Sequence, residues 1–396
     1  MSQILHFIFG LITIILLALI ISKNPKKIQI RFIIQILTIE IIFAYLFLDT
    51  QIGLTTTYKI SNFFNTLLIF AKEGIDFVFG NMNNAELAFF FLNVLCPIIF
   101  ISSLIGILKH MKILSILITS IGYLLSKING MGKLESFNAV SSLIFGQTEN
   151  FIAYKDILTK IPKQRMYTMA TTAMSTASMA ILGVYMNMLN PKYVVIAVIL
   201  NMFSAFIILS LSNPYQITKE NDLYILSFYN NEKNIFEILQ EYIYTGLKIT
   251  IIITAMLIGF IALIHTINAI FNTLFHITLQ DVIGYIFIPC AWIIGIPEHE
   301  CFQVARIMAT KLITNEFIAI IELQKISETL STKSIGILSV FLVSFANFSS
   351  IGIIVGAIKG LNEKQAKVIS HYGLKLLYNA ILINLLSANI IGLVIK

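Results

Sequence analysis

The chain is a succession of apolar segments, each long enough to cross a lipid bilayer. A hydrocarbon core of about 30 Å takes roughly 20 helical residues, twice what a barrel strand needs. Of 396 residues, 57% are apolar and only 12% are charged, and the mean hydropathy is +0.87, which excludes a water-soluble domain of ordinary composition. The sequence therefore predicts an all-α, multi-pass integral membrane protein with eight transmembrane helices, at 3–22, 30–48, 87–108, 166–188, 193–211, 246–266, 335–358 and 374–395.

The distribution of charge predicts the topology. Basic residues gather in the stretches 23–31, 109–133, 155–165 and 359–375. If these face the cytoplasm, as the positive-inside rule expects, both termini lie outside. The net charge of +7 then reports topology and contact with anionic membrane lipid, and it does not indicate nucleic-acid binding. The three cysteines are scattered, so no disulfide, metal site or cofactor is predicted: Cys96, Cys290 and Cys301.

Two further segments, 134–160 and 299–325, contain polar runs in the middle of apolar sequence. Neither a lipid-facing span nor an aqueous loop explains such a run. A re-entrant helical hairpin enters and leaves the membrane on one side and places its turn at mid-depth, where irregular backbone is tolerated only against protein or a water-filled cavity. Three amphipathic segments suit helices that lie in the membrane interface, at 61–80, 111–128 and 267–286.

The tips of the two hairpins are near copies of each other. Residues 148–153 read Thr-Glu-Asn-Phe-Ile-Ala and residues 314–319 read Thr-Asn-Glu-Phe-Ile-Ala, so each tip carries an acid, Glu149 or Glu316, where a charge is expensive. Three predicted crossings separate the copies. An odd number gives the copies opposite orientations, which is the inverted repeat common among secondary transporters.

This order of elements predicts five regions. Scaffold segments alternate with two transport repeats, and each repeat consists of a hairpin, a broken helix and a span. The regions are 1–85 (N-terminal spans and an interfacial helix), 86–130 (scaffold span and interfacial helix), 131–211 (first transport repeat), 212–298 (scaffold span and interfacial helix) and 299–396 (second transport repeat).

Polar side chains at the hairpin tips and in two interrupted spans form the candidate site. Small polar residues interrupt 170–181 and 344–350, and broken helices expose carbonyls and helix N-termini that hold ions and polar solutes. Amides and carboxylates beside aromatic rings suit a polar ring with hydroxyls, such as a nucleoside or a sugar. The alternative is that these groups only join helix to helix. The candidates are Gln147, Thr148, Glu149, Asn315, Glu316, Asn347, Ser349 and Ser350, with Phe345 and Phe348 beside them.

Three motifs carry a family resemblance: Gly-Gln-Thr-Glu at 146–149, Asn-Glu-Phe at 315–317 and Phe-Ala-Asn-Phe-Ser-Ser-Ile-Gly at 345–352. In this order and spacing the chain closely resembles the concentrative nucleoside transporter family, in particular its bacterial, proton-coupled nucleoside permease branch. The resemblance implies a homotrimer in the bacterial cytoplasmic (inner) membrane that imports nucleosides such as uridine, cytidine or adenosine by cation symport and alternating access. Transferred by motif, the substrate-binding residues are Gln147, Thr148, Glu149, Glu316, Phe345, Asn347 and Ser350.

The coupling ion is the least determined part of the resemblance. Sodium-coupled members are similar to one another in an Asn before the hairpin glycine and a Ser in the following broken helix, and here those positions hold Ser142 and Ala180. Backbone carbonyls at Phe145 and Ile181 could still help to hold sodium, a hard cation that needs several oxygens. Glu149 offers a carboxyl group that can carry a proton in apolar surroundings. The sequence favours a proton, with sodium as the alternative.

Two other classes of protein compete with a transporter. An intramembrane hydrolase could use two buried acids as a catalytic dyad, but the chain has no paired-aspartate or nucleophile motif around either acid. A channel could be built from polar hairpins. Uphill accumulation of substrate distinguishes a transporter from a channel. Because the motifs of a hydrolase are missing from the sequence, we predict that the protein is not an enzyme.

Overall fold

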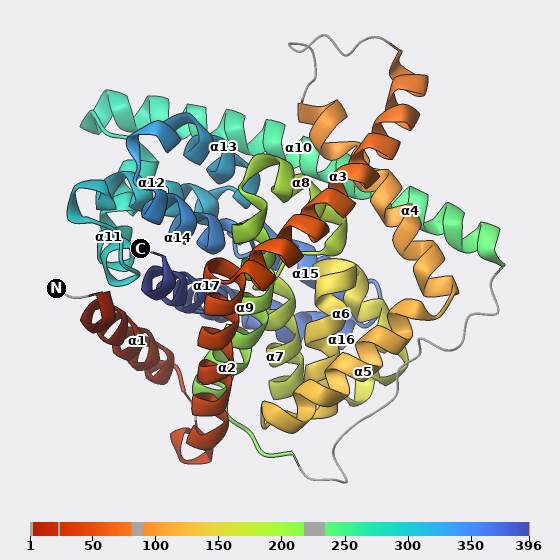
Figure 1. The fold of residues 1–396 in the computed structure, drawn as a ribbon, viewed down its shortest axis with the longest axis horizontal. Coiled ribbons are helices and arrows are strands. Elements are labelled where there is room, and N and C mark those ends of the chain that lie inside the picture. Colours follow the sequence, from red (N-terminus) through yellow and green to blue (C-terminus); the bar gives the residue numbers. More distant parts are fainter. Residues whose placement is uncertain (1–2, 23, 81–89, 218–233, 396) are drawn as a thin grey trace.

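The computed structural model describes residues 3–22, 24–80, 90–217 and 234–395, and every regular element in these residues is helical (Figure 1). The all-α prediction is confirmed. The α-helices are α1 Gln3–Ile20, α2 Ile30–Asp49, α3 Gln51–Phe79, α4 Pro97–His110, α5 Ile113–Ile128, α6 Lys133–Glu149, α7 Lys163–Met174, α8 Met179–Met188, α9 Pro191–Ser212, α10 Ile235–Phe275, α11 Leu279–Ile293, α12 Glu298–Ile313, α13 Glu316–Ile326, α14 Thr332–Leu342, α15 Phe348–Lys359, α16 Glu363–His371 and α17 Gly373–Val394. A π-helical turn, Phe90–Leu95, precedes α4, and a 3₁₀ segment, Asn150–Lys160, follows α6.

Most of the predicted spans correspond to helices that suit a membrane. Within the described residues, six helical segments are long and apolar enough to cross a bilayer: α1, α2, Phe90–His110, Lys163–Met188, α9 and α17. Residues 87–89 of the predicted third span lie outside the described residues. The predicted span 335–358 is divided between α14 and α15, each too short to cross alone, and the division falls at the run of small polar residues.

The predicted bounds of the interfacial helix, 267–286, are wrong. Helix α10 continues to Phe275, making 41 residues, and the chain then bends by 86° into α11. His276 takes a left-handed backbone conformation (φ 56°) at the bend, and Thr278 and Asp281 form a capping box that starts α11. The boundary also differs for the segment predicted at 61–80, because α3 already begins at Gln51, where the Thr50 side chain caps it.

The two halves of the chain follow one plan. Lys112 (φ 62°) turns the chain from α4 into α5 at the place in the first half where His276 turns α10 into α11. Helix α10 packs along α4, while α5 packs on α6 and α11 on α12. Gly122 in α5 and Gly284 in α11 allow the close approach, because a Cβ at either position would lie 2.2 Å from Phe137 or 3.1 Å from Arg306.

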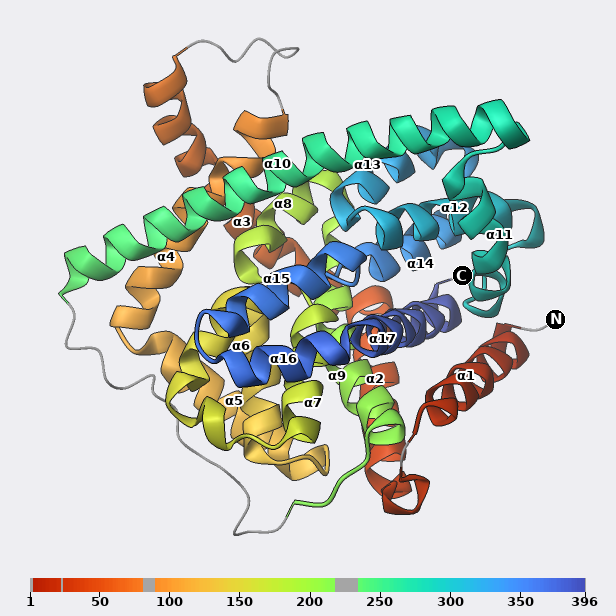
Figure 2. The same cartoon turned by 180° about the vertical axis from the view of Figure 1, so that it is seen from behind.

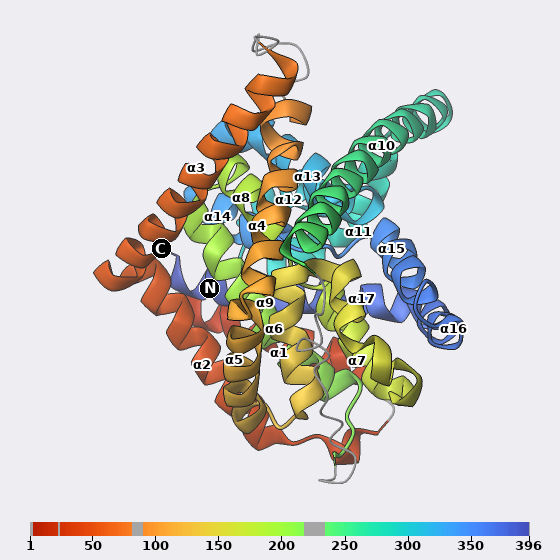
Figure 3. The same ribbon diagram turned by 90° about the vertical axis from the view of Figure 1, so that its right-hand side faces the viewer.

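Helices α9 and α17 form the centre of the bundle, while the other elements surround them (Figures 2 and 3). Both contain the sequence Asn-x-x-Ser-Ala-x-Ile-Ile, at 201–208 and 384–391. The two asparagines bond to each other, Asn384 Nδ2 to Asn201 Oδ1 at 3.2 Å, and so do the serines, Ser387 Oγ to Ser204 Oγ at 3.0 Å. Equivalent residues that meet in this way lie on the axis relating two repeats.

Each hairpin is tied at its open end to the broken helix that follows it. In the first half, Glu135 at the start of α6 accepts two hydrogen bonds from Arg165 of α7, at 2.5 and 2.7 Å, and both side chains are buried. In the second half, Glu300 of α12 accepts from the backbone N and hydroxyl of Ser331, the residue that caps α14, both at 3.0 Å. These links fix the hairpins at their bases.

Candidate functional site

The tip of the first hairpin is shaped by Gly146. Its backbone has φ +83° and ψ −176°, which breaks α6 and which a residue with a side chain rarely adopts. Beyond the turn, Asn150 points back into the hairpin, and its Nδ2 donates to Asn138 Oδ1 at 2.7 Å. Because Asn150 is used inside the hairpin, the side chains of Gln147, Thr148 and Glu149 are the polar groups that the tip presents to its surroundings.

The tip of the second hairpin holds Glu316 in place. Asn315 caps α13, since its Oδ1 accepts from the backbone N of Ile318 at 3.1 Å. Glu316 is therefore the first residue of the helix, a position that favours an acid. Its carboxylate is 3% exposed and accepts from the Tyr185 hydroxyl at 2.8 Å and from Asn347 Nδ2 at 3.1 Å.

Asn347 lies in the break of the second broken helix, directly before α15. Its Oδ1 caps α15 by accepting from the backbone N of Ser350 at 2.9 Å, and it also accepts from Ser349 Oγ at 2.7 Å. Its Nδ2 is the donor to Glu316 already described. One side chain thus starts a helix and orients the buried acid at the same time.

The two halves of the chain meet at this break. The backbone N of Phe345, in the second break, donates to the carbonyl of Thr176, in the break between α7 and α8, at 3.1 Å. Gln147 Nε2 of the first hairpin donates to Ser350 Oγ of α15 at 3.3 Å. Segments that are far apart in the sequence therefore converge on one region.

A cavity of about 550 Å³ lies where the hairpin tips and the second break converge. This volume lies in the range of small-molecule sites, which are mostly apolar with a few placed polar groups. All seven of the predicted substrate-binding side chains line it, as do Phe145 and Ile181. Ser142 is not among the lining residues and is fully buried in α6. Phe348 is also not among them and is 45% exposed.

One acceptor in the cavity lacks a donor. Gln147 Oε1 is buried, and no described residue donates a hydrogen bond to it. A buried acceptor without a partner costs about 1–3 kcal/mol. A solute carrying an N–H group could therefore gain affinity by donating to Gln147.

Some functional groups were missed by the sequence interpretation. Tyr185, whose hydroxyl donates to Glu316, lies in the predicted span 166–188, and the signal in the sequence was a tyrosine inside an apolar span, because a buried hydroxyl usually finds a partner. The wall that α10 contributes was also missed, because 246–266 reads as an ordinary span. The α10 residues that line the cavity are Thr245, Lys248, Ile249, Ile252 and Ile253.

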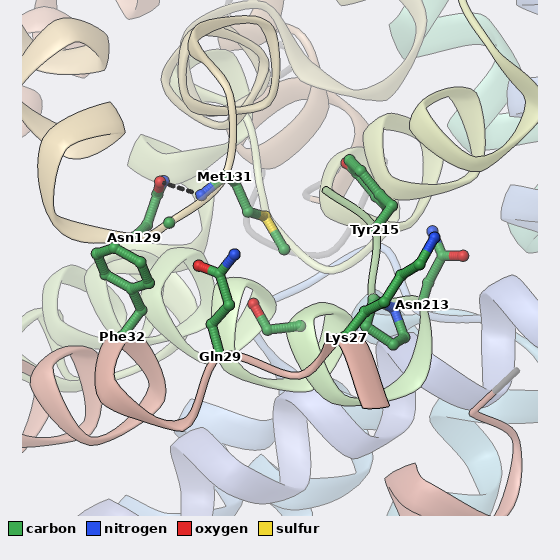
Figure 4. A pocket seen from close by; sticks show the side chains of 10 residues that line it. Lys27, Gln29, Phe32, Asn129, Met131, Asn213 and Tyr215 are labelled. Atoms are coloured by element: carbon green, nitrogen blue, oxygen red, sulfur yellow. Dashed lines mark hydrogen bonds between the residues drawn. The ribbon is translucent and has the colours of Figure 1, made fainter. Parts of the chain in front are cut away.

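A smaller pocket lies away from these residues (Figure 4). Its volume is about 20 Å³, and its lining comes from the segment before α2, the end of α5 and the end of α9. Asn129 Oδ1 there accepts from the backbone N of Met131 at 2.9 Å (Figure 4). This pocket contains none of the predicted site residues and is too small for a nucleoside or a sugar.

Comparison with known proteins gives the family. Residues 9–82 and 193–392 match the models described as Na+ dependent nucleoside transporter N-terminus and C-terminus, and residues 91–192 match the model described as Nucleoside recognition. Purine nucleoside transport protein NupG of Bacillus subtilis is 35% identical, covering 97% of both chains. Nucleoside permease NupC of Helicobacter pylori is 26% identical, covering 99% of this chain and 98% of the permease.

Solved structures agree with this assignment. CNTnw in an inward-facing substrate-bound state has a TM-score of 0.92 at 27% identity, with both chains covered completely. A doubly substituted CNTnw in an outward-facing state has a TM-score of 0.91 at 27% identity, covering 99% of this chain and 97% of that one. The matching families and relatives are nucleoside transporters and not enzymes, which sets aside the intramembrane hydrolase. This multi-pass membrane protein belongs to the concentrative nucleoside transporter family.

Proposed function

We propose that this chain imports nucleosides across a bacterial cytoplasmic membrane by cation symport, through alternating access. The observation that carries the proposal is the cavity at which both hairpin tips meet the second broken helix, with amide, carboxylate and hydroxyl groups in a mostly apolar wall. Such a wall suits a molecule with one flat, hydrogen-bonding ring and one set of hydroxyls. A nucleoside has both parts.

The two ends of the cavity suit different parts of the substrate. Gln147 and Thr148 offer an amide and a hydroxyl that can pair with the edge of a base, and Gln147 Oε1 still lacks a donor. Glu316 and Asn347 are bonded to each other and can together hold the hydroxyls of a ribose, with Ser350 beside them. We therefore place the base at the first hairpin and the ribose at the second.

The contrast between the two acids supports coupling to a proton. Glu316 is fixed by two donors, whereas within the described part of the chain no hydrogen bond holds the carboxylate of Glu149. Glu149 also lines the cavity and is less deeply buried than Glu316. An acid that no hydrogen bond fixes in a mostly apolar site can bind and release a proton, and Lys109 and Glu241 are the charged residues that act on it. We propose Glu149 as the proton carrier.

Sodium is the alternative coupling ion. The first hairpin is close to the first broken helix, because a Cβ on Gly146 would lie 2.9 Å from Ser178, and Phe145 and Ile181 line the same cavity. The Ser142 hydroxyl, which donates to the Asn138 carbonyl at 2.6 Å, offers one oxygen, and the side chain of Ala180 offers none. A sodium ion here would rely mainly on backbone carbonyls.

Uptake into proteoliposomes tests the proposal. Radiolabelled uridine and adenosine are offered under a pH gradient in sodium-free buffer and, separately, under a sodium gradient at equal pH. Accumulation driven by the pH gradient alone supports proton symport, and accumulation driven by sodium alone rejects it. Passive flux that survives an uncoupler would support a channel. Guanosine and cytidine as competitors decide between purine and pyrimidine preference, since the Bacillus subtilis relative is described as a purine nucleoside transport protein.

A double substitution tests the coupling assignment directly. Ser142→Asn with Ala180→Ser restores the two side chains that the sodium-coupled pattern carries. We expect uptake to become sodium-responsive, since both side chains would add oxygens beside the carbonyls of Phe145 and Ile181. Ser142→Asn alone serves as the comparison. If sodium has no effect on the double variant, coupling does not depend on these two positions.

The assembly proposed from the resemblance is a homotrimer in which the hairpins and broken helices move against a scaffold that includes α10. Mass measurement of the detergent-solubilised protein by light scattering tests the trimer. A monomeric mass would reject it.

A further inference from the structure

A buried lysine joins the second hairpin to the second broken helix. Lys311 of α12 is 1% exposed, and its ammonium group donates to the carbonyl of Phe341, to Ser344 Oγ at 2.8 Å and to Asn384 Oδ1 at 3.0 Å. An ammonium has three N–H donors, and all three are used. Every partner is a neutral oxygen, and in the described residues no carboxylate lies within the 4.0 Å of an ion pair with Lys311.

The position of the ammonium explains this choice of partners. Phe341 is in the last turn of α14, where carbonyls have no partner in the helix and the helix dipole favours a positive charge. The Nζ atom also lies 4.6 Å from the centre of the Phe341 ring, a distance that adds a cation–π attraction. The Lys311 ammonium occupies the place of a bound monovalent cation, because it donates hydrogen bonds to the oxygens that the broken helix exposes.

The network extends from Lys311 to the axis between the repeats. Ser344 Oγ donates to the same Asn384 Oδ1 at 2.6 Å, Asn384 donates to Asn201, and Asn201 Nδ2 donates to the carbonyl of Val343 at 2.8 Å. The break between α14 and α15 is thus held from both sides, by Lys311 and by the asparagine pair. The ammonium is the single charge among these hydrogen-bonded groups, and Glu316, beyond ion-pair distance, is the acid that acts on it electrostatically.

The break held in this way contains the residues that shape the cavity. Phe345 follows Ser344 directly and bonds to the first broken helix, and Asn347 caps α15 and holds Glu316. The same hairpin therefore contacts the break twice, through Lys311 and through Glu316. In the first hairpin the matching position is Phe145, which has no charge, so the two halves of the site are held differently.

We propose that Lys311 is a positioning residue: a tethered cation that takes the place of a bound ion in the second broken helix and holds Asn347 and Glu316 in register for the substrate. This inference rests on the proposed function, because the register matters through nucleoside binding. It assigns to the second repeat a cationic group carried by the chain itself, while a mobile coupling ion is left to the first.

Replacement of the tether tests the inference. Lys311→Ala leaves the three oxygens without a donor and leaves room for a small amine, whereas Lys311→Met fills the space with an uncharged chain. We expect both variants to bind nucleoside at least tenfold more weakly in calorimetry. Methylammonium should restore the affinity of Lys311→Ala, tetramethylammonium should not, and neither should restore Lys311→Met. Lys325→Ala, an exposed lysine on α13 of the same hairpin, is the control and should bind as the unmodified protein does.

Melting curves measured without nucleoside test the cation site at Lys311 independently of the proposed function. Methylammonium should raise the melting temperature of Lys311→Ala and leave that of Lys311→Met and the unmodified protein unchanged. A Lys311→Ala variant that gains no stability from methylammonium would overturn the tethered cation, whatever the protein transports. Unchanged nucleoside affinity in Lys311→Met would overturn the positioning role. If the unmodified protein binds no nucleoside, the proposed function fails and the melting curves still decide the cation site.

Discussion

Asn347 offers a substitution that separates its two roles. Its Oδ1 caps α15, and its Nδ2 donates to Glu316 at 3.1 Å. Serine is as good a helix cap as asparagine, but it has no amide to reach the carboxylate. Asn347→Ser therefore removes the contact to the acid and keeps the cap, while Asn347→Ala removes both.

The expected magnitudes follow from these contacts. A hydrogen bond to a charged group contributes about 1.5–3 kcal/mol, and Glu316 would keep the Tyr185 hydroxyl as its side-chain donor among the described residues. Since about 1.4 kcal/mol is a factor of ten, Asn347→Ser should weaken nucleoside binding about 10- to 150-fold. The loss of the cap in Asn347→Ala should remove about a further 1 kcal/mol of folding stability.

Calorimetric titration with nucleoside and thermal melting of the purified protein measure the two effects. Asn347→Ser should lose affinity and melt close to the unmodified protein, while Asn347→Ala should lose affinity and melt lower. The reasoning is refuted if Asn347→Ser binds nucleoside normally. It is also refuted if the two variants melt at the same lowered temperature, because the side chain would then be structural only.

Three other predictions follow from the site. Glu149→Gln should abolish accumulation driven by a pH gradient while nucleoside binding persists; accumulation that survives would assign the proton to another group. Gly146→Ala should destabilise the protein by about 1–3 kcal/mol in thermal melting, because the backbone has φ +83° and the methyl carbon would lie 2.9 Å from a neighbouring side chain; Gly259→Ala, which meets open space, is the control. Tyr185→Phe should weaken nucleoside binding in the same titration about tenfold or more by removing the other donor to Glu316, and unchanged affinity would contradict that role.

The sequence predicted the parts of this protein that depend on local chemistry. Apolar runs of about 20 residues predict spanning helices because lipid cannot satisfy a free backbone. The paired tips at 148–153 and 314–319 indicate a repeat, because a charged group is costly in lipid and two such groups occur at matching positions. The signal for a second pair, Asn-x-x-Ser-Ala at 201–205 and 384–388, was equally present in the sequence, and it marks where α9 and α17 meet.

The boundary between α10 and α11 required the structure. Hydropathy falls after about residue 266, which suggested a boundary there, but α10 continues to Phe275, because a fall in hydropathy does not by itself stop a helix. The turn depends on a left-handed residue, His276, and on the capping box of Thr278 and Asp281. The matching helix in the first half, α5, was predicted close to its observed bounds. Adding the residue offset between the two repeats to those bounds would have predicted α11.

The sequence by itself determined that this chain is a helical membrane protein with two related hairpins, because segment length, hydropathy and repetition are read along the chain. Only the tertiary structure decided which groups face one another across the cavity. The sequence could list Glu316 and Asn347, but it could not show that the Tyr185 hydroxyl donates to the acid or that Lys311 donates to the break between α14 and α15. Those pairings join residues distant in sequence, and only the packing of the helices brings such residues within hydrogen-bonding distance.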